Sequence, residues 1–242
     1  QYYRKRRRRF TDWLASRFEG LLLIGLRFEP LFRLLYRPQL LPAFVNTPSL
    51  DIYTGPVTHW DAVPIKTDDY DLCLLVDTWS MAFDGLRVQK VRQSLIQLGI
   101  KPLLIAPFEN GKGAHLAGDM KRFKAISGWV IKRLEQIAKK GYPLVGIEPS
   151  ITLTYRDEHA SPVPVQLLQE WLGSQPLTPK TVSEPVSSAP YYLLGHCMEK
   201  ACISDSDGLW QQIFKKRGLQ LEHVQVGCCG MAGMFGHQKR HQ

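Results

Sequence analysis

Two patterns of apolar positions alternate between residues 71 and 172, and together they predict the fold. Short continuous apolar runs, typical of strands covered on both faces, occur at 72–76, 103–105 and 143–147. Apolar residues recur at helical spacing at 88–98, at 120–140 and around 165–172. Gly99 is predicted to end the first of these helices, and Asp119 to cap the second. Because strands alternate with helices, we expect an α/β layer with parallel strands.

The same order of strand, helix and strand recurs near the carboxyl end. A strand is predicted at 191–197, a helix at 209–217 and a second strand at 221–227. Aligning the two copies puts Trp79 opposite Cys197, and Pro107 and Phe108 opposite Cys228 and Cys229. Loops that follow neighbouring parallel strands lie at one edge of a sheet, so Cys197 is expected to approach the other two cysteines. About thirty residues of the second copy are expected to lie beyond the end of the sequence, by comparison with the first.

These patterns divide the chain into two pseudo-repeated parallel-sheet α/β units and their connections. The predicted parts are a basic helical arm at 1–36, an extended linker at 37–69, a first unit at 70–172, a linker rich in Ser, Pro and Thr at 173–189, and a second, C-terminally truncated unit at 190–242. Within the arm, Pro30 is expected to break or restart the helix.

Positive charge is concentrated in the arm. The formal net charge is +9, and six consecutive basic residues run from Arg4 to Arg9. Three interpretations of this run stay open: a solvated helix face or connector, contact with an anionic membrane surface or acidic partner, and nucleic-acid binding. No nucleic-acid motif accompanies the run, so a nucleic-acid partner is not expected. The later apolar run at 21–35 carries Arg27, Glu29 and Arg33 and is too charged to span a bilayer.

The chain has five cysteines, and four of them fall in its last quarter. An odd number argues against a closed disulfide framework, and adjacent Cys228 and Cys229 would bridge each other only with strain. Reduced thiols in the cytoplasm are therefore expected, with peripheral contact at the inner face of a membrane left open. Cys73 lies within a predicted strand and is interpreted as a core residue. No Ser/His/Asp arrangement or carboxylate pair stands out, so the chain by itself is not expected to be catalytic.

One stretch, Gly227-Cys228-Cys229-Gly230-Met231-Ala232-Gly233-Met234-Phe235-Gly236, joins two cysteines to a run of glycines. Neighbouring thiolates can hold iron or zinc, and glycines let the backbone approach a bulky cluster. We therefore interpret Cys197, Cys228 and Cys229 as metal ligands and Gly230 and Gly233 as cofactor-binding residues. Buried structural thiols and plain turn glycines remain the alternatives. Cys202 is interpreted as a bystander, and His196 either tunes the site or is structural.

These residues resemble a known pattern. Cys197, a gap of about thirty residues, and Cys228-Cys229-Gly230 followed by Ala232, Gly233, Phe235 and Gly236 resemble the cysteine-rich CCG domain. That domain occurs in heterodisulfide reductase and in the iron–sulfur subunits of glycolate and lactate oxidases. It usually comes as two pseudo-repeats, and its motif ends in a further Cys-x-x-Cys. The basic arm with Asp12-Trp13-Leu14 is similar to a segment of large FAD-linked oxidases of the bacterial D-2-hydroxyglutarate dehydrogenase type.

The resemblance implies the iron–sulfur electron-transfer region of a flavin-dependent 2-hydroxy acid dehydrogenase. It implies a cluster of the 4Fe-4S type, FAD in the parent protein outside this chain, and flavin and ferredoxin-like domains of the same polypeptide as partners. Electrons would pass to a quinone or a soluble carrier. The first unit lacks the motif's cysteines and is expected to bind no cluster, and the closing Cys-x-x-Cys is expected beyond Gln242. Three thiolates are one short of a cubane set, so the cluster could be absent from this chain. The alternative is a docking or scaffold domain that holds a partner subunit or membrane through the basic arm.

Overall fold

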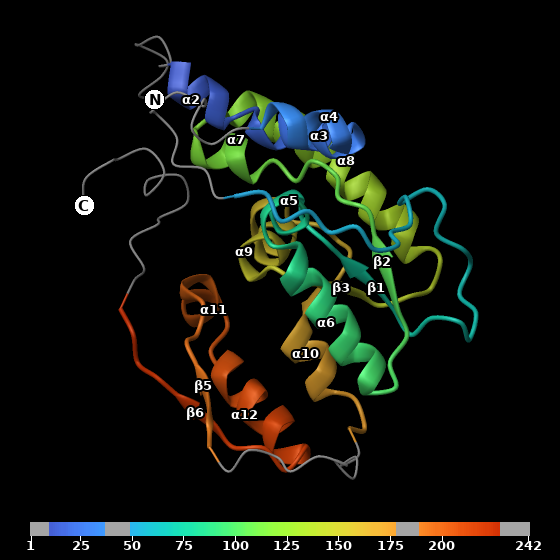
Figure 1. Ribbon diagram of the computed structural model, residues 1–242, viewed down its shortest axis with the longest axis vertical. Helices are drawn as coiled ribbons and strands as arrows, with labels where there is room; N and C mark the ends of the chain where they lie inside the picture. Colours follow the sequence, from blue (N-terminus) through green and yellow to red (C-terminus); the bar gives the residue numbers. More distant parts are fainter. Residues whose placement is uncertain (1–9, 37–48, 178–188, 228–242) are drawn as a thin grey trace.

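A four-stranded parallel sheet with helices on both faces forms the centre of the computed structural model (Figure 1). The structure describes residues 10–36, 49–177 and 189–227. The strands are β1 (Leu72–Leu75), β2 (Pro102–Ile105), β3 (Leu144–Gly146) and β4 (Val165–Leu167), in the order β2-β1-β3-β4. Leu74 pairs with Leu104 on one side and with Val145 on the other. The predicted α/β class and parallel pairing are confirmed.

Helices α5 (Thr78–Phe83) and α6 (Gly85–Gln97) connect β1 to β2, and α7 (Lys112–Leu116) and α8 (Met120–Ala138) connect β2 to β3. Between β3 and β4 lie α9 (Pro149–Leu153) and the π-helical turn η1 (Thr154–Glu158). As predicted, Asp119 caps α8, and its carboxylate accepts the backbone N–H of Arg122. The helix predicted at 88–98 ends at Gln97 with Leu98 as its cap, and Gly99 follows as the predicted stop with a φ of +81°, a conformation that favours glycine.

The two faces of the sheet bury alternate residues of the same strands. Cys73 and Leu75 of β1 pack in the core beneath α8, whose buried stripe includes Val130 and Leu134. Leu72 and Leu74 point the other way, into a core shared with α6 and with α10 (Leu168–Gly173). A side chain of this size contributes about 1.5–3 kcal/mol when it is fully buried. Apolar residues at every strand position are therefore needed, which explains the continuous apolar runs in the sequence.

The residues from 165 to 172 differ from the predicted helix. Val165–Leu167 form strand β4 beside β3, and only Leu168–Gly173 form helix α10. Three residues are too few for periodicity to distinguish a strand from the first turn of a helix. The free edge of β3 decides the matter, because pairing there satisfies the backbone groups of β4.

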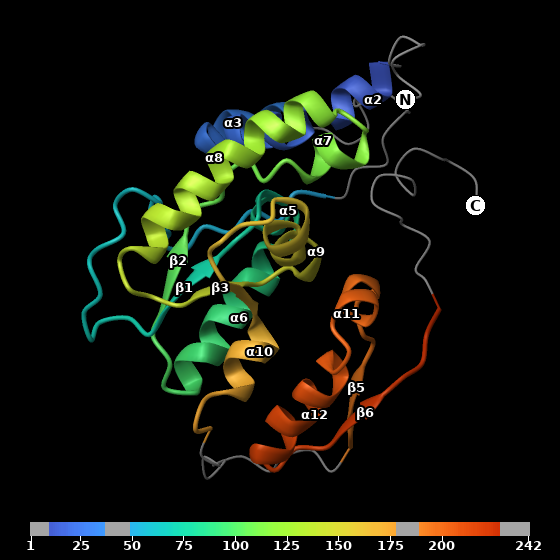
Figure 2. The ribbon, with the colours of Figure 1, turned by 180° about the vertical axis from the view of Figure 1, so that it is seen from behind.

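The amino-terminal helices lie against the first unit beside α7 and α8 (Figures 1 and 2). They are α2 (Phe10–Ala15), α3 (Phe18–Arg27) and α4 (Glu29–Leu35), and Pro30 in the first turn of α4 restarts the helix as predicted. From 49 to 69 the chain has no helix or regular strand, as expected. Thr58 nevertheless forms a parallel bridge with Ile105, at the outer edge of β2. The basic run Arg4 to Arg9 lies outside the described residues.

The second unit contains a two-stranded parallel sheet of β5 (Tyr191–Leu193) and β6 (Leu221–His223), with α11 (Cys197–Cys202) and α12 (Ser206–Lys216) between them. Its α12 packs against α10, and its α11 packs against α9 of the first unit. No helix in the described ranges has both the length and the apolar content needed to cross a bilayer.

Candidate functional site

The first predicted ligand, Cys197, is the first residue of α11, and its side chain is exposed. The helix begins there because His196 caps it: the imidazole Nδ1 accepts the backbone N–H of Met198 at 3.2 Å. The Glu199 carboxylate in turn accepts the backbone N–H of His196 at 3.3 Å. This reciprocal capping box holds Cys197 at a defined place after β5.

The strand before Cys197 and the strand before Cys228 are direct neighbours. Leu193 of β5 pairs with His223 of β6, and the N–H of Val224 donates to the carbonyl of Leu193 at 2.9 Å. Cys197 follows Leu193 by four positions, and Cys228 follows Val224 by four positions. The chain therefore leaves β5 and β6 at the same edge of their sheet. Cys228, Cys229, Gly230 and Gly233 themselves lie outside the described residues.

The repeat is visible in the hydrogen bonds as well as in the order of elements. After α6, the N–H of Ile100 donates to the backbone carbonyl of Leu95 at 2.9 Å. After α12, the N–H of Leu219 donates to the backbone carbonyl of Phe214, also at 2.9 Å. Gly99 and Gly218 occupy the same left-handed position in these two turns. By position in the helices, however, Cys197 corresponds to Thr78, the first residue of α5, and not to Trp79 as predicted. The connection from β5 to α11 is one residue longer than the connection from β1 to α5.

Buried polar side chains join the two units directly beneath α11. The Gln169 side chain on α10 is 2% exposed, and its amide nitrogen donates to Glu199 on α11 and, at 2.8 Å, to Ser206 on α12. His196 faces the first unit, with its Nε2 3.8 Å from the Glu148 carboxylate. Burial lowers the pKa of His196, which favours the neutral ring that accepts from Met198. The first unit therefore supports the segment that carries Cys197.

A cavity of about 320 Å³ lies at the carboxyl edge of the first sheet, on the same side of the first unit as this contact. Asp77, Arg87, Lys112 and Glu148 are among its lining residues. The pKa of Glu148 is raised to about 7, mainly by burial and also by the nearby charge of Asp77, while the backbone N–H of Ile151 acts in the opposite direction. The cavity lining thus combines acidic and basic groups and has no cysteine.

The glycine-rich loop of the first unit is engaged by a carboxylate from the amino-terminal helices. Both oxygens of Glu19 on α3 accept backbone N–H groups, from Asn110 at 2.8 Å and from Gly111 at 3.0 Å. Consecutive N–H groups that end in a left-handed residue form an anion-binding nest, and Gly111 has a φ of +80°. Burial raises the pKa of Glu19 to about 8, and the two N–H groups oppose that rise. In the first unit, the loop aligned with the second unit's cysteine loop therefore binds the side-chain carboxyl group of Glu19, a residue of the same chain.

Several residues of this region are hard to recognise from the sequence. Glu19, Glu148, Gln169 and Glu199 are charged or amide residues of helices and loops, and such residues are usually solvated. Glu199 was detectable in principle, because a glutamate three positions after a capping residue completes a capping box. The core role predicted for Cys73 is confirmed: its side chain is fully buried, and burial raises the pKa of the thiol to about 12.

The chemistry of the described donor set fits one ligand of a thiolate-bound metal centre. Cys197 provides an accessible sulfur at a capped helix start, and two more cysteines follow β6 in the sequence. Within 10–36, 49–177 and 189–227, no three His, Cys, Asp or Glu side chains are grouped so that they could hold a metal ion. The predicted set of Cys197, Cys228 and Cys229 stays a prediction.

Comparison with known proteins finds relatives that share one name. The chain is 34% identical over 171 residues to the D-2-hydroxyglutarate dehydrogenase of Pantoea ananatis, which covers 68% of this chain and 16% of that protein. It is 35% identical over 174 residues to the enzyme of that name from Escherichia coli, covering 69% of this chain and 17% of the relative. The corresponding protein of Haemophilus influenzae is 33% identical over 184 residues, covering 71% and 18%.

The chain therefore spans less than a fifth of the length of these relatives. No protein-family model matches the chain, and no solved structure matches it.

Proposed function

We propose that this chain, which is related in sequence to a segment of bacterial D-2-hydroxyglutarate dehydrogenases, is the iron–sulfur electron-transfer region of a flavin-dependent 2-hydroxy acid dehydrogenase. In the whole protein, FAD would oxidise the 2-hydroxy acid to the 2-keto acid. The flavin and a ferredoxin-like domain would be supplied by other parts of the polypeptide. Electrons would leave through the region described here to a quinone or a soluble carrier.

The observation that carries the proposal is the pairing of β5 with β6. The bond from the Val224 N–H to the Leu193 carbonyl aligns the two strands. Cys197 and the Cys228-Cys229 pair each follow one of these strands, so one sheet edge would gather the three thiols. Adjacent cysteines and glycines at such an edge suit a cluster, because thiolates bind iron and glycines allow close approach.

An iron–sulfur cluster bound there would supply one-electron transfer, which is needed when a two-electron flavin passes electrons on singly. Cys197 would be a ligand through its thiolate. His196 would act as a positioning residue, because its cap fixes the first turn of α11. Glu199 and Gln169 would hold that turn against the first unit. The first unit would serve as the scaffold for the second.

The test is anaerobic reconstitution, with iron and sulfide, of the complete polypeptide encoded by the reading frame. We expect bound iron and acid-labile sulfide, a broad absorbance at about 400 nm and an EPR signal on reduction, as is typical of thiolate-bound clusters. Cys197→Ser, Cys228→Ser and Cys229→Ser should each lower the iron content. Cys202→Ser is the matched control, because Cys202 is an exposed cysteine at the other end of the same helix.

Two outcomes would overturn the proposal. One is a polypeptide that takes up no iron although its circular dichroism shows it to be folded. The other is iron uptake that falls equally in Cys202→Ser and Cys197→Ser, which would assign the metal to exposed thiols in general.

A further inference from the structure

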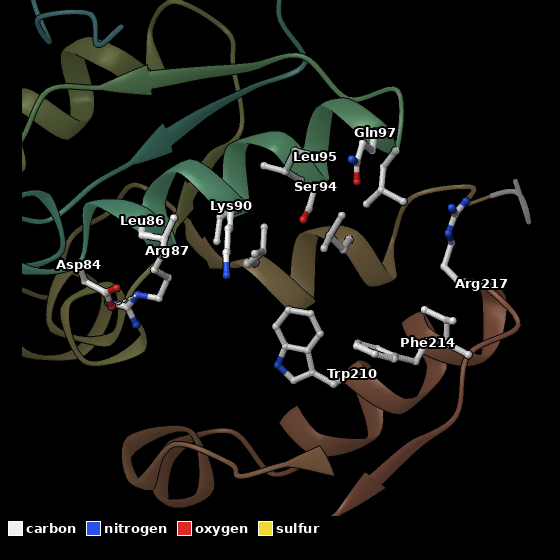
Figure 3. Close-up of a pocket in the computed structure, with 15 residues that line it drawn as sticks. Asp84, Leu86, Arg87, Lys90, Ser94, Leu95, Gln97, Trp210, Phe214 and Arg217 are labelled. Atoms are coloured by element: carbon white, nitrogen blue, oxygen red, sulfur yellow. Dashed lines mark ion pairs between the residues drawn. The ribbon is translucent and has the colours of Figure 1, made fainter. Parts of the chain in front are cut away.

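A groove lies between α6 and α10 of the first unit and α12 of the second (Figure 3). It is on the side of the molecule away from the amino-terminal helices (Figure 1). Its volume is about 560 Å³, within the range of small-molecule binding sites. Trp210 and Phe214 extend from α12 across the groove toward α6, from which Lys90 and Ser94 extend in the opposite direction. We call this space the inter-unit pocket.

The walls of the inter-unit pocket are mainly apolar. Val91 and Leu95 of α6 and Leu98, which follows it, line the pocket on one side, and Leu168 and Leu172 line it from α10. These five side chains are aliphatic, and the indole and phenyl rings of Trp210 and Phe214 cover them from the other unit. Apolar walls of this kind attract an apolar ligand chain, because each buried methylene contributes about 0.8 kcal/mol to binding.

The charges at the pocket are predominantly positive. Arg87, Lys90 and Arg217 line it, and the single acidic lining residue is Asp84. Asp84 is neutralised by Arg87, whose Nε lies 2.7 Å from the Asp84 carboxylate. Lys90 forms no ion pair or side-chain hydrogen bond with any residue in the described part of the chain. An exposed ammonium group therefore stands above an aliphatic groove.

We propose that the inter-unit pocket binds an aliphatic monocarboxylate, with its hydrocarbon chain between α10 and α12 and its carboxylate paired with Lys90. The apolar walls select the chain, and the excess of positive charge selects an anionic end over a neutral or cationic one. The volume and the aliphatic walls suit the hydrocarbon chain of this class, whereas a short, doubly charged acid would leave those walls without an apolar partner. The site is distinct from the edge where Cys197 lies, and it does not depend on a cluster being bound.

Such a ligand would contact both units at once. The contacts with α6 and α10 belong to the first unit, and the contacts with Trp210 and Phe214 belong to the second. Because these surfaces face each other only when the units are docked, binding would stabilise the docked arrangement by mass action.

The test uses isothermal titration of the full chain with decanoate, decyl maltoside and decyltrimethylammonium, each below its critical micelle concentration. Decanoate should bind at one site and raise Tm. The neutral maltoside should bind about two- to fivefold more weakly, since one ion pair at an exposed site changes affinity by about that factor, and the cation should bind more weakly still because it is repelled by Lys90.

Two variants locate the site, each with a matched control. Ser94→Trp should fill the groove and weaken decanoate binding about tenfold or more, since a filled pocket leaves no apolar surface for the chain. Gln93→Trp, at the preceding position of α6, should leave binding unchanged because Gln93 is exposed and does not line the pocket. Lys90→Gln should weaken decanoate binding about two- to fivefold without changing maltoside binding, whereas Lys124→Gln on α8 should change neither.

The proposal is overturned if decanoate does not bind, as would follow if another segment of the chain fills the pocket. It is also overturned if decanoate and decyltrimethylammonium bind alike. A third contrary result is decanoate binding that Ser94→Trp leaves intact while the protein keeps its wild-type circular dichroism.

Discussion

Gln169 donates the hydrogen bond of its side-chain amide to the carboxylate of Glu199, a residue 30 positions later that belongs to the other unit. Both side chains are buried, at 2% and 7% exposure. The same amide also donates to Ser206, so one side chain of α10 holds the beginnings of both α11 and α12. A buried amide with two partners specifies one docking geometry, because any displacement of the units leaves buried polar atoms unpaired.

Replacing Gln169 by Leu should therefore lower the free energy of unfolding by about 1–3 kcal/mol, since Glu199 and Ser206 would lose a buried partner. Urea unfolding followed by circular dichroism measures this change. Gln212→Leu on α12 is the control, because Gln212 is exposed and surface changes usually stay within about 0.5 kcal/mol. Equal effects of the two substitutions would show that the buried amide does not hold the units together.

Stability should depend on pH through Glu19. The pKa of Glu19 is raised from 4.5 to about 8, mainly by burial and also by the charges of Glu109 and Asp77, while the Asn110 and Gly111 N–H groups act in the opposite direction. Between pH 4.5 and 8 the folded protein keeps a proton that the unfolded chain has released. This contribution to stability is therefore complete below pH 4.5 and is lost as the pH rises to about 8.

Urea unfolding at pH 5, 6, 7 and 8 should show this loss. In Glu19→Gln, the free energy of unfolding should fall less steeply with pH, by up to about 1.4 kcal/mol per pH unit. Glu29→Gln on α4 is the control, because that carboxylate is paired with Arg33 at the surface. If the wild type and Glu19→Gln give parallel pH profiles, the Glu19 carboxyl is not the titrating group.

The described cysteines should differ in their reactivity toward iodoacetamide. Cys197 and Cys202 are exposed, whereas Cys73 is fully buried and burial raises the pKa of its thiol to about 12. Because the thiolate is the reactive form, Cys73 should be protected in the folded, reduced protein and should react only after unfolding in urea. Peptide mass spectrometry measures the three rates. Alkylation of Cys73 at the rate of Cys202 in the native protein would contradict its place in the core.

Two glycines with open surroundings should respond to alanine in opposite directions. A methyl group at Gly128 in α8 or at Gly99 after α6 would meet no heavy atom within 4 Å apart from its chain neighbours and, at Gly128, the backbone of its own helix. Gly128 is inside a helix, so Gly128→Ala should stabilise the protein by about 0.5–1 kcal/mol. Gly99 has a φ of +81°, so Gly99→Ala should destabilise it by about 1–2 kcal/mol. Thermal unfolding measures both changes, and shifts of the same sign would contradict the backbone assignment.

Much of the architecture follows from local patterns in the sequence. The runs at 72–76, 103–105 and 143–147 became β1, β2 and β3, because a strand buried on both faces needs apolar residues at every position. The helical periodicity at 120–140 became α8 for the same kind of reason. The repeat of strand, helix and strand also emerged from the sequence, and the matching glycine turns after α6 and α12 agree with it.

The contacts that surround the candidate site were decided by tertiary structure. Glu19 reaches a loop that lies 91 positions later, and nothing near Glu19 in the sequence distinguishes it from a solvated glutamate. Strand β4 exists because β3 offers an unpaired edge, while its three residues alone carry too little periodicity to be recognised. The one-residue difference between Cys197 and its predicted counterpart depends on loop length, which the alignment of apolar residues does not constrain.

The difference between the features that the sequence predicts and those that only the tertiary structure decides has a physical cause. Burial of apolar side chains repeats along each element with a fixed period, so the sequence of a single segment reveals which face is covered. A single polar side chain has little effect on the secondary structure of its own segment. Its role depends on a partner that the folding of distant segments brings near. The cysteines and glycines from Cys197 to Gly236 therefore indicate a chemistry through their residue types and spacing alone. Only the fold identifies Glu19, Gln169 and Glu199 as the residues that hold the amino-terminal helices and the two units in place.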